Sequence, residues 1–541
     1  GFRLGGNSSS IAGRESISIR GTQSKHTLIL VDGKRVSGTD AQIGHSDFQY
    51  NWVPINSIEK IEIIRGPMSS IYGSQAIGGV INIITKKTNK PFYGNISVLG
   101  ASSSADGGNE SDMSLTMGGK ATKDLRLSLS VENKETKPTY KKSDSNTVLR
   151  EGKKIKNALI DIDYNIDDTQ SISASYLKGR ELRSNTSSSV FYKEYYKIDK
   201  NNHSLGYKKN FSDITLDMKY YVTKSKSHSG NSNFTHKLKD TVLNTEFAID
   251  SFENQFIITG IEYRTEAYDK VYDTLSSSDF SDKISYKSAY IQDEIELGEK
   301  VILTLGTRYD KHERFGAELT PKANIVYNIN EKHKLKTSYG HGFNAPTLTE
   351  NSSSYSVSHG PSFFKGNDNL EAEKSDTIEV GYEYYANSIV FKSSIFHTKI
   401  KDLIDYKKIS SGPTVNQYTN IDKATMQGIE LEYSQKDLFE NLDLNIAYDY
   451  LKTKNKETNK ALARKPKHNM NMKISYTLPY KIDSNIRLNY TGKQFDTSNN
   501  QLGGYTTYGF QFSKDFGKGL SSKIGVENLG NKILSDNSDY N

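Results

Sequence analysis

The sequence predicts an all-β membrane protein, an antiparallel transmembrane β-barrel preceded by a small N-terminal domain. Three observations predict this fold class. From residue 90 onward, apolar and polar residues alternate in segments of about ten residues, the length of a strand that crosses a membrane. Short and long polar links separate these segments in turn, as the two edges of such a barrel require. The longest apolar run, residues 76–84, is far too short to span a bilayer as a helix.

The N-terminal domain is most clearly marked by residues 58–86. Two apolar strand-like runs, residues 61–64 and 80–84, flank a link that is rich in glycine and contains one proline. Such residues reverse the backbone repeatedly, so we predict a compact module of loops and strands and no helix. Glycine-rich turns also bind phosphates, but neither Gly-Lys-Ser/Thr nor G-x-G-x-x-G follows a strand here. Nucleotide binding is therefore not indicated.

Strand faces can be read from the region after residue 90. Residues 125–131 place leucine or valine at every odd position and arginine or serine between them. Residues 160–166 place isoleucine or tyrosine at every even position and aspartate or asparagine between them. One face of each segment then meets hydrocarbon and the other meets water or the N-terminal domain. A soluble β-sandwich alternates too, but it gives no reason for short and long links to alternate.

The strand count leads to an expectation about completeness. We expect about 21 strands between residues 92 and 533, whereas bacterial single-chain barrels have even numbers, 22 among them. The last strand is therefore expected to be missing, with a gap between residues 92–101 and 520–529. The longest links are predicted near residues 135–152, 269–282, 344–370 and 403–417. The first residues lack the basic and apolar regions of a signal peptide, so we expect a processed or trimmed N-terminus.

Composition narrows the function classes. The chain has no cysteine, which excludes disulfides and thiolate metal sites. Lysine and arginine number 71 against 64 acidic residues, too even a balance for a nucleic-acid footprint. A mildly basic surface instead suits an anionic ligand or lipopolysaccharide. The 11 histidines are scattered without an H-E-x-x-H motif, and we expect neither an enzyme nor a metal site.

Several segments resemble one known family. Residues 58–86 (IEKIEIIRGPMSSIYGSQAIGGVINIITK) and 27–36 (TLILVDGKRV) closely resemble the plug domain of TonB-dependent outer-membrane receptors, as do IRG at 19–21 and DFQYNWVP at 47–54. In the later region, FNAP at 343–346, NDNL at 367–370 and VENL at 526–529 resemble barrel segments of the same family.

The resemblance implies an organisation, a location and a partner. Residues 1–89 would be a plug domain that lacks its first part and the TonB box, and residues 90–541 would be the barrel that lacks its last strand. The protein would lie in the bacterial outer membrane as a monomer and work with the TonB complex of the inner membrane.

The resemblance also implies ion pairs between plug and barrel. The family holds its plug partly by pairing plug arginines with barrel glutamates, and the matching positions here are Arg20, Arg65, Glu379 and Glu430. Alternation supports the two acidic residues, because their neighbours Ile378, Val380, Ile429 and Leu431 would face lipid. Glu383 and Glu432 share the same inward faces and remain competitors.

Ligand contacts are expected from the tips of the plug and from the long loops, because loops on a rigid scaffold carry recognition. Aromatic faces combined with cations suit a flat, aromatic, anionic guest. The candidates are Arg14, His45, Phe48, Tyr50, Tyr140, Lys141, Lys142, Arg150, Tyr355, His359, Phe363, Phe364 and Lys365.

Two ligands remain open at this point. The plug segments look most like those of the colicin I receptor and of ferric enterobactin receptors, which implies import of a ferric catecholate siderophore. Iron would then arrive chelated, so no cofactor and no protein metal ligand are expected. The alternative is a haem receptor, in which a plug histidine and a loop histidine hold the iron, and His45 and His359 lie at comparable places. Asn344 stands where haem receptors usually carry arginine. Docking of a bacteriocin would be a secondary role.

Overall fold

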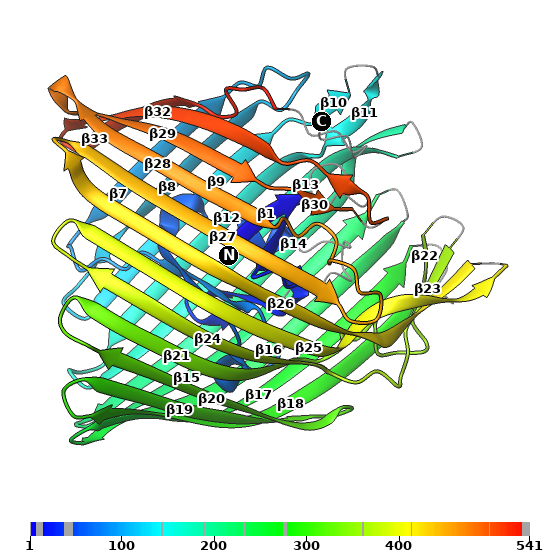
Figure 1. Cartoon of the computed structure of the whole chain (residues 1–541), viewed down its shortest axis with the longest axis horizontal. Helices are drawn as coiled ribbons and strands as arrows, with labels where there is room; N and C mark the ends of the chain where they lie inside the picture. Colours follow the sequence, from blue (N-terminus) through cyan, green and yellow to red (C-terminus); the bar gives the residue numbers. More distant parts are fainter. Residues whose placement is uncertain are drawn as a thin grey trace.

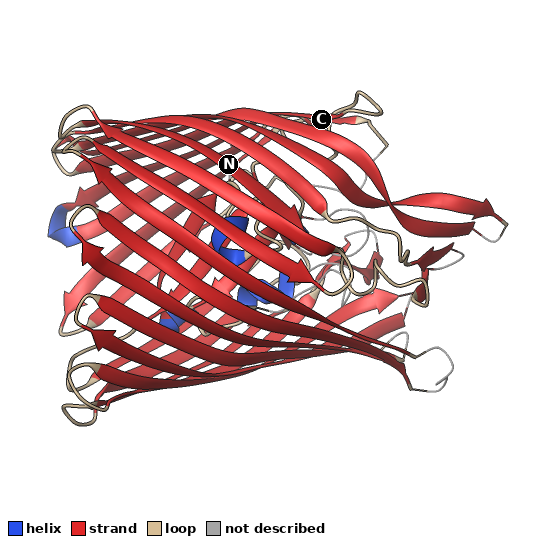
Figure 2. Cartoon of the chain, turned by 90° about the horizontal axis from the view of Figure 1, so that it is seen from below, coloured by secondary structure: helices blue, strands red, loops and turns tan. Residues whose placement is uncertain are grey.

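The protein is described by a computed structural model that covers residues 2–6, 15–36, 47–141, 144–187, 190–230, 233–273, 279–359, 362–412, 414–496 and 498–532. Its long tilted strands surround a lumen, and the N-terminal segments lie inside this ring (Figure 1). The same arrangement is seen from below, where short helices lie inside the wall of strands and one further helical turn lies at its left edge (Figure 2). The described residues therefore form a barrel with an inner domain.

A four-stranded sheet organises the inner domain. Its order is β4 (Lys34–Arg35), β3 (Thr27–Val31), β6 (Gly79–Thr85) and β5 (Ile58–Arg65), with β3 parallel and β5 antiparallel to β6. All five residues of β3 are buried, as a central strand with both faces covered requires. The two apolar runs predicted as strands are thus partners in one sheet.

Short elements complete the inner domain: β1 (Phe2–Gly6), which pairs with β2 (Glu15–Ile19), and the single turns η1 (Ser24–His26), η2 (Asp47–Asn51), η3 (Ile55–Ser57) and α1 (Ser69–Tyr72). The prediction of no helix in the link between β5 and β6 is wrong at α1. Gly73 ends this turn with φ of 70°, a conformation that glycine adopts readily. A single helical turn is too short to produce a 3.6-residue apolar repeat, so the sequence pattern gave no sign of it.

The inner domain is wedged against the wall by apolar contacts. Trp52 and Ile83 pack with Leu159 and Leu177 of the wall, in one buried cluster. On another side Ile77 packs among wall residues of the long hairpin described below. The apolar core therefore lies partly within the domain and partly between domain and wall.

The closed sheet of the described residues contains 23 strands, of which β22 (Ser356–His359) and β23 (Ser362–Lys365) form a hairpin at the rim. The other 21 form the wall, which is the number that was predicted. Neighbours are antiparallel throughout, and β21 pairs directly with β24. The wall strands are β7 (Tyr93–Ala101), β8 (Glu110–Lys120), β9 (Leu125–Thr136), β12 (Gly152–Asn165), β13 (Gln170–Ser187), β14 (Val190–Phe211), β15 (Ile214–Ser229), β16 (Phe234–Phe252), β17 (Gln255–Tyr272), β18 (Phe280–Leu297), β19 (Val301–His312), β20 (Gly316–Asn328), β21 (His333–Asn344), β24 (Glu373–Tyr385), β25 (Ile389–Ser411), β26 (Thr414–Phe439), β27 (Leu442–Asn455), β28 (His468–Leu478), β29 (Ile482–Thr491), β32 (Tyr505–Gly517) and β33 (Leu520–Val526).

The predicted alternation of faces is confirmed along these strands. In β12, Leu159 is buried against the inner domain, whereas Ile160 on the opposite face keeps 43% of its surface exposed. An outward apolar face and an inward polar face are what a barrel surrounded by lipid requires.

The rim with long links carries additional strands. These are β10 (Thr139–Lys141), β11 (Asp144–Arg150), β22 (Ser356–His359), β23 (Ser362–Lys365), β30 (Gln494–Phe495) and β31 (Gln501–Leu502), while the turn η5 (Pro479–Lys481) lies at the other rim. The prediction of a loop at 403–417 is largely wrong, because β25 and β26 remain paired across this region up to Ser411 and Thr414. This hairpin extends beyond the wall, where β23 joins β26 in parallel (Figure 1). Strands with water on both faces need no alternation of apolar and polar residues, so the sequence pattern did not indicate this extension.

One seam in the wall differs from the others. The barrel order closes on itself, with β33 followed by β7. Every other pair of neighbouring wall strands forms a ladder, in a few pairs with register shifts, but among the described residues no residue-by-residue ladder joins β33 to β7. All residues of β33 are exposed. The expectation of a further strand at this place stays a prediction.

Candidate ligand site and inner-domain contacts

Arg20 joins the inner domain to two wall strands. It follows β2 in a turn with φ of 51°, a conformation that costs a residue other than glycine about 1–3 kcal/mol. Its guanidinium donates to Glu379 at 2.8 and 3.0 Å and to Glu430 at 2.9 and 3.2 Å, and lies 4.4 Å from the centre of the Phe396 ring. Burial lowers the pKa of Arg20, but the hydrogen bonds and charges of the two carboxylates outweigh it, so that the pKa is raised. The planar fork of arginine is suited to this double pairing.

Arg65, at the end of β5, reaches the same acidic group. It donates to Glu430 at 3.3 Å and to Glu432 at 2.6 Å. The structure thus brings together all four residues predicted for the ion pairs, and adds Glu432. The other competitor, Glu383, instead accepts from Lys336 at 2.7 Å. Because Glu432 is 39% exposed, its bond with Arg65 is weaker than the buried pair around Arg20.

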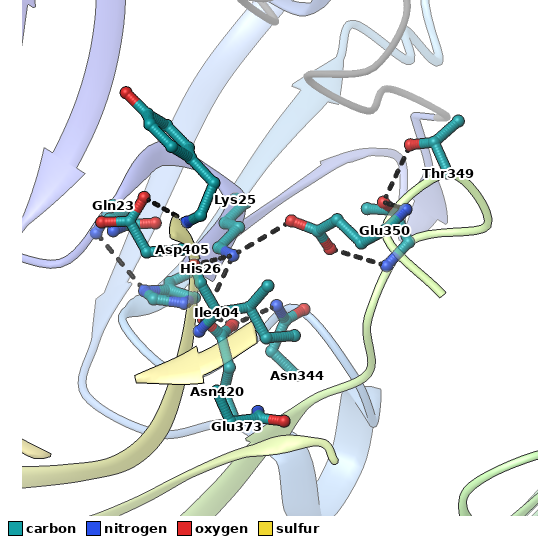
Figure 3. Close-up of polar contacts among 12 residues, drawn as sticks. Gln23, Lys25, His26, Asn344, Thr349, Glu350, Glu373, Ile404, Asp405 and Asn420 are labelled. Atoms are coloured by element: carbon teal, nitrogen blue, oxygen red, sulfur yellow. Dashed lines mark hydrogen bonds and ion pairs between the residues drawn. The ribbon is translucent and has the colours of Figure 1, made fainter. Parts of the chain in front are cut away.

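A second polar cluster holds the turn η1 against the barrel (Figure 3). Glu373, the first residue of β24, is fully buried. Its carboxylate lies 2.8 Å from His26 Nε2 and 3.1 Å from Lys25 Nζ, and accepts from Asn344 at 2.6 Å and from the backbone of Ile404 at 2.9 Å. This one carboxylate therefore connects the inner domain with three wall strands.

Lys25 extends this cluster to the link between β21 and β22. Its ammonium lies 3.4 Å from Glu350, and it also donates to the carbonyl of Ile404 at 3.3 Å. Glu350 in turn accepts from the backbone of Thr347 at 2.9 Å. A movement of the link at 345–355 would therefore change the contact between Glu350 and Lys25 of the inner domain (Figure 3).

The same link closes over a cation that lies among aromatic rings. Lys270, near the end of β17, is 1% exposed, and its ammonium has no hydrogen-bond partner in the described part of the chain. It lies 4.8 Å from the ring centres of Phe234 and Tyr272 and 5.6 Å from that of Tyr355. Burial raises the pKa of Tyr355 to about 12, so this phenol stays neutral and does not balance the ammonium. A buried cation without a counterion is costly, and the ring faces offset part of that cost.

The remaining predicted ligand residues are only partly placed. Arg14, His45 and Lys142 lie outside the described residues, as do the side chains of Phe48, Lys141 and His359. Tyr50 accepts a hydrogen bond from the backbone of Ile17 at 2.8 Å and packs on the inner core, which gives it a structural role.

Two hairpins carry the other predicted residues at the long-link rim. Tyr140 and Arg150 belong to the pair β10–β11. Phe363, Phe364 and Lys365 belong to β23, where Phe364 meets Tyr406 edge to face at 5.0 Å. Tyr355 is buried with Tyr268 and Phe280 instead of lining an open surface.

Sequence reasoning missed Lys25, His26, Lys270, Glu350 and Glu373. Alternation does place Lys270 on the inward face together with Arg264 and Tyr268, so the correct face was available from sequence. The sequence did not show how deeply Lys270 is buried, because alternation does not tell which link folds over a given inward residue.

Two general searches gave negative results within the described ranges. No helix there is both long and apolar enough to cross a membrane. No group of three or more histidine, aspartate or glutamate side chains in that part of the chain could hold a metal ion.

Comparison with known proteins identifies the family to which this architecture belongs. The family described as TonB dependent receptor-like, beta-barrel matches residues 121–529, and the TonB-dependent Receptor Plug Domain matches residues 1–80. The chain therefore belongs to the TonB-dependent receptors, and its inner domain is their plug.

Relatives and solved structures agree with this family. The iron-regulated outer membrane virulence protein of Vibrio cholerae is 27% identical over 88% of this chain and 76% of its own length. A ferric enterobactin receptor of Pseudomonas aeruginosa is 27% identical over 99% of this chain and 85% of its own. A crystal structure of the ferric enterobactin receptor from that organism has a TM-score of 0.88 at 24% identity, and covers 98% of this chain and 89% of that one.

Proposed function

We propose that this protein imports a ferric catecholate siderophore across the bacterial outer membrane, with energy delivered to the plug by the TonB complex. The relatives named as ferric enterobactin receptors support this cargo. In this proposal the iron is cargo that arrives wrapped by its chelator, so the protein supplies no metal ligand and no cofactor.

The observation that carries the proposal is Lys270 in its ring of aromatic side chains. Its ammonium has no anionic partner in the described part of the chain, and three aromatic rings face it. A ferric catecholate is anionic and presents aromatic rings, so it complements both features. Because Tyr355 covers Lys270, the ligand would gain access when the link at 345–355 moves.

That link also supplies a route from ligand to plug. Tyr355 contacts the Lys270 site, and Glu350, five residues earlier, contacts Lys25 of the plug. Displacement of the link by a ligand would therefore loosen the contacts of η1. Import would follow when TonB acts on a plug whose upper contacts have been weakened in this way.

The proposal includes location and assembly. The apolar outer face of the barrel supports insertion into the outer membrane, where in this proposal the protein is a monomer surrounded by lipopolysaccharide. A bacteriocin could use the projecting hairpins for docking, as a role secondary to import. A haem receptor remains the alternative cargo class, and it depends on His45 and His359.

Quenching of intrinsic fluorescence tests the cargo on the purified receptor. We expect saturable quenching by ferric enterobactin, and a loss of affinity of about tenfold or more in Lys270→Met, because the cation that faces the anionic guest is removed. Lys311→Met is the matched control, because Lys311 is an exposed lysine on the outer face of β19 and should leave the affinity unchanged.

Haemin titration of the same proteins separates the two cargo classes. The double variant His45→Ala/His359→Ala should bind ferric enterobactin like the original protein. Saturable haemin binding that disappears in this double variant, with no quenching by ferric enterobactin in the original, would overturn the siderophore proposal.

A further inference from the structure

The outer surface of the wall has an apolar groove that import does not explain. It has a volume of about 340 Å³ and lies across β12 to β15. Its apolar lining includes Ile160, Ile162, Tyr176, Leu205 and Tyr220. Leu205 is 58% exposed, which shows that this lining faces outward. A groove of this kind is shaped for an acyl chain lying along the barrel.

Basic side chains lie immediately beyond the groove on the same outward faces. Strand pairing places them in two neighbouring rows, and we call these six residues the basic rows: Lys178, Arg180, Lys224, Lys226, Lys237 and Lys239. Lys178 is two residues from Tyr176 of the groove, and Lys224 is four residues from Tyr220. Charge and groove therefore belong to one continuous surface.

Like charges face one another directly in the basic rows. Lys224 pairs across the strands with Lys239, and Lys226 with Lys237. None of these four lysines has a carboxylate partner among the described residues, and all four are exposed. Like charges at directly opposed positions destabilise a sheet, so an anion between them would be stabilising.

The acidic neighbours do not cancel this charge. Asp199 forms an ion pair with Arg180, at 2.6 Å. Asp269 lies opposite Lys237 in register and accepts from Ser281 at 2.6 Å. These two carboxylates are outnumbered by the six cations of the basic rows. The surface is left with a clear excess of positive charge.

The height of the basic rows matches a membrane interface. Lys224 is the eleventh residue of β15, counted from the rim with short turns. With a rise of about 3.3 Å per residue and a tilt of about 40°, it lies about 25 Å from that rim, near the top of the apolar band of a barrel. Short turns mark the periplasmic side, so this is the level of the outer-leaflet headgroups.

We infer that this face is a binding site for a phosphorylated, acylated lipid of the outer leaflet, namely the lipid A part of lipopolysaccharide. One acyl chain occupies the groove, and a phosphate lies between the paired lysines of β15 and β16. The inference goes beyond import and does not depend on which siderophore is the cargo.

The test measures lipid A retained by the purified receptor, in moles of phosphate and fatty acid per protein. In the variant Lys224→Gln/Lys226→Gln/Lys237→Gln/Lys239→Gln we expect at least a threefold loss. The matched control replaces four exposed lysines of the short-turn rim, Lys123, Lys300, Lys332 and Lys518, by glutamine and should retain as much as the original. Leu205→Trp, which fills the groove without changing charge, should lose retention too. Equal retention by the original and the quadruple variant of β15 and β16 would overturn the inference.

Three added probes identify the chemistry. Bisphosphorylated lipid A should raise the thermal unfolding temperature of delipidated receptor, and this shift should be absent from the quadruple variant. Dephosphorylated lipid A should give less than half the shift, and inorganic phosphate none. Equal shifts of the unfolding temperature from phosphorylated and dephosphorylated lipid A would overturn the inference. An equal shift from inorganic phosphate alone would overturn it as well. An unchanged unfolding temperature of each delipidated variant shows that it is folded, and keeps this outcome distinct from that of the import proposal.

Discussion

At the scale of single residues, two polar clusters attach the plug to the barrel. Arg20 binds two glutamates on β24 and β26, the barrel strands on either side of β25, and Glu373 binds two residues of η1. Arg20, Glu430 and Glu373 are buried, and Glu379 and Lys25 are partly buried, so removal of a partner leaves a poorly compensated charge in the lumen. The two clusters should therefore be sensitive to single substitutions.

Arg20→Ala should weaken the seating of the plug by about 3–5 kcal/mol, because it leaves Glu379 without a cation and the buried Glu430 with only the longer contact to Arg65, at 3.3 Å. Arg65→Ala is the comparison, and its effect should be clearly smaller because Glu432 is partly in water. Hydrogen exchange of the strands of the plug in the full receptor measures both. Equal protection in Arg20→Ala and in the original would contradict the role given to Arg20.

Glu373→Gln should release η1, because the amide keeps the shape but cannot pair with the charge of Lys25. We expect faster hydrogen exchange at residues 22–27 and easier access of a protease to that turn. Glu350→Gln removes only the longer contact of Lys25, at 3.4 Å, and should have a smaller effect. If both variants exchange like the original, Glu373 does not hold the turn.

At the scale of elements, the plug sheet depends on a close approach between β5 and β6. A β-carbon at Gly79 would lie 2.2 Å from the carbonyl oxygen of Ile64, and its φ is 152°. The two strands pair across this point, where Arg65 lies opposite Gly79. Only glycine permits that pairing, and Arg65 is directed to its glutamates by it.

Gly79→Ala should therefore disrupt the pairing and destabilise the plug by about 1–3 kcal/mol or more, the range for forced backbone conformations. The control is Gly33→Ala, which also has a positive φ, of 74°, but meets no atom within 4 Å. Chemical denaturation followed at Trp52, which is buried in the plug, measures both variants. An equal loss in the two would mean that the contact with Ile64 is not the cause.

At the scale of the whole molecule, the excess of positive charge concerns how a ligand arrives. The chain carries a formal net charge of +7, so an anionic siderophore is attracted before it makes contact. Attraction of this kind acts through solvent and is screened by salt.

The association rate constant for ferric enterobactin should therefore fall by about threefold or more between low and physiological ionic strength. The dissociation rate constant should change less, because it depends on contacts in a site closed to solvent. Stopped-flow fluorescence measures both constants. Association that is independent of salt would show that long-range attraction plays no part.

The sequence by itself determined the fold class, the faces of the barrel strands and two strands of the plug, because these depend on local alternation and turn chemistry. It also brought Arg20, Glu379 and Glu430 together, through resemblance and alternation. The tertiary structure decided which inward residues lie beneath a link, as at Lys270, and that Glu432 joins the ion pairs. It also decided that β25 and β26 extend beyond the wall. Depth and long-range contact depend on residues far apart in the chain, and a pattern of period two carries no information about them.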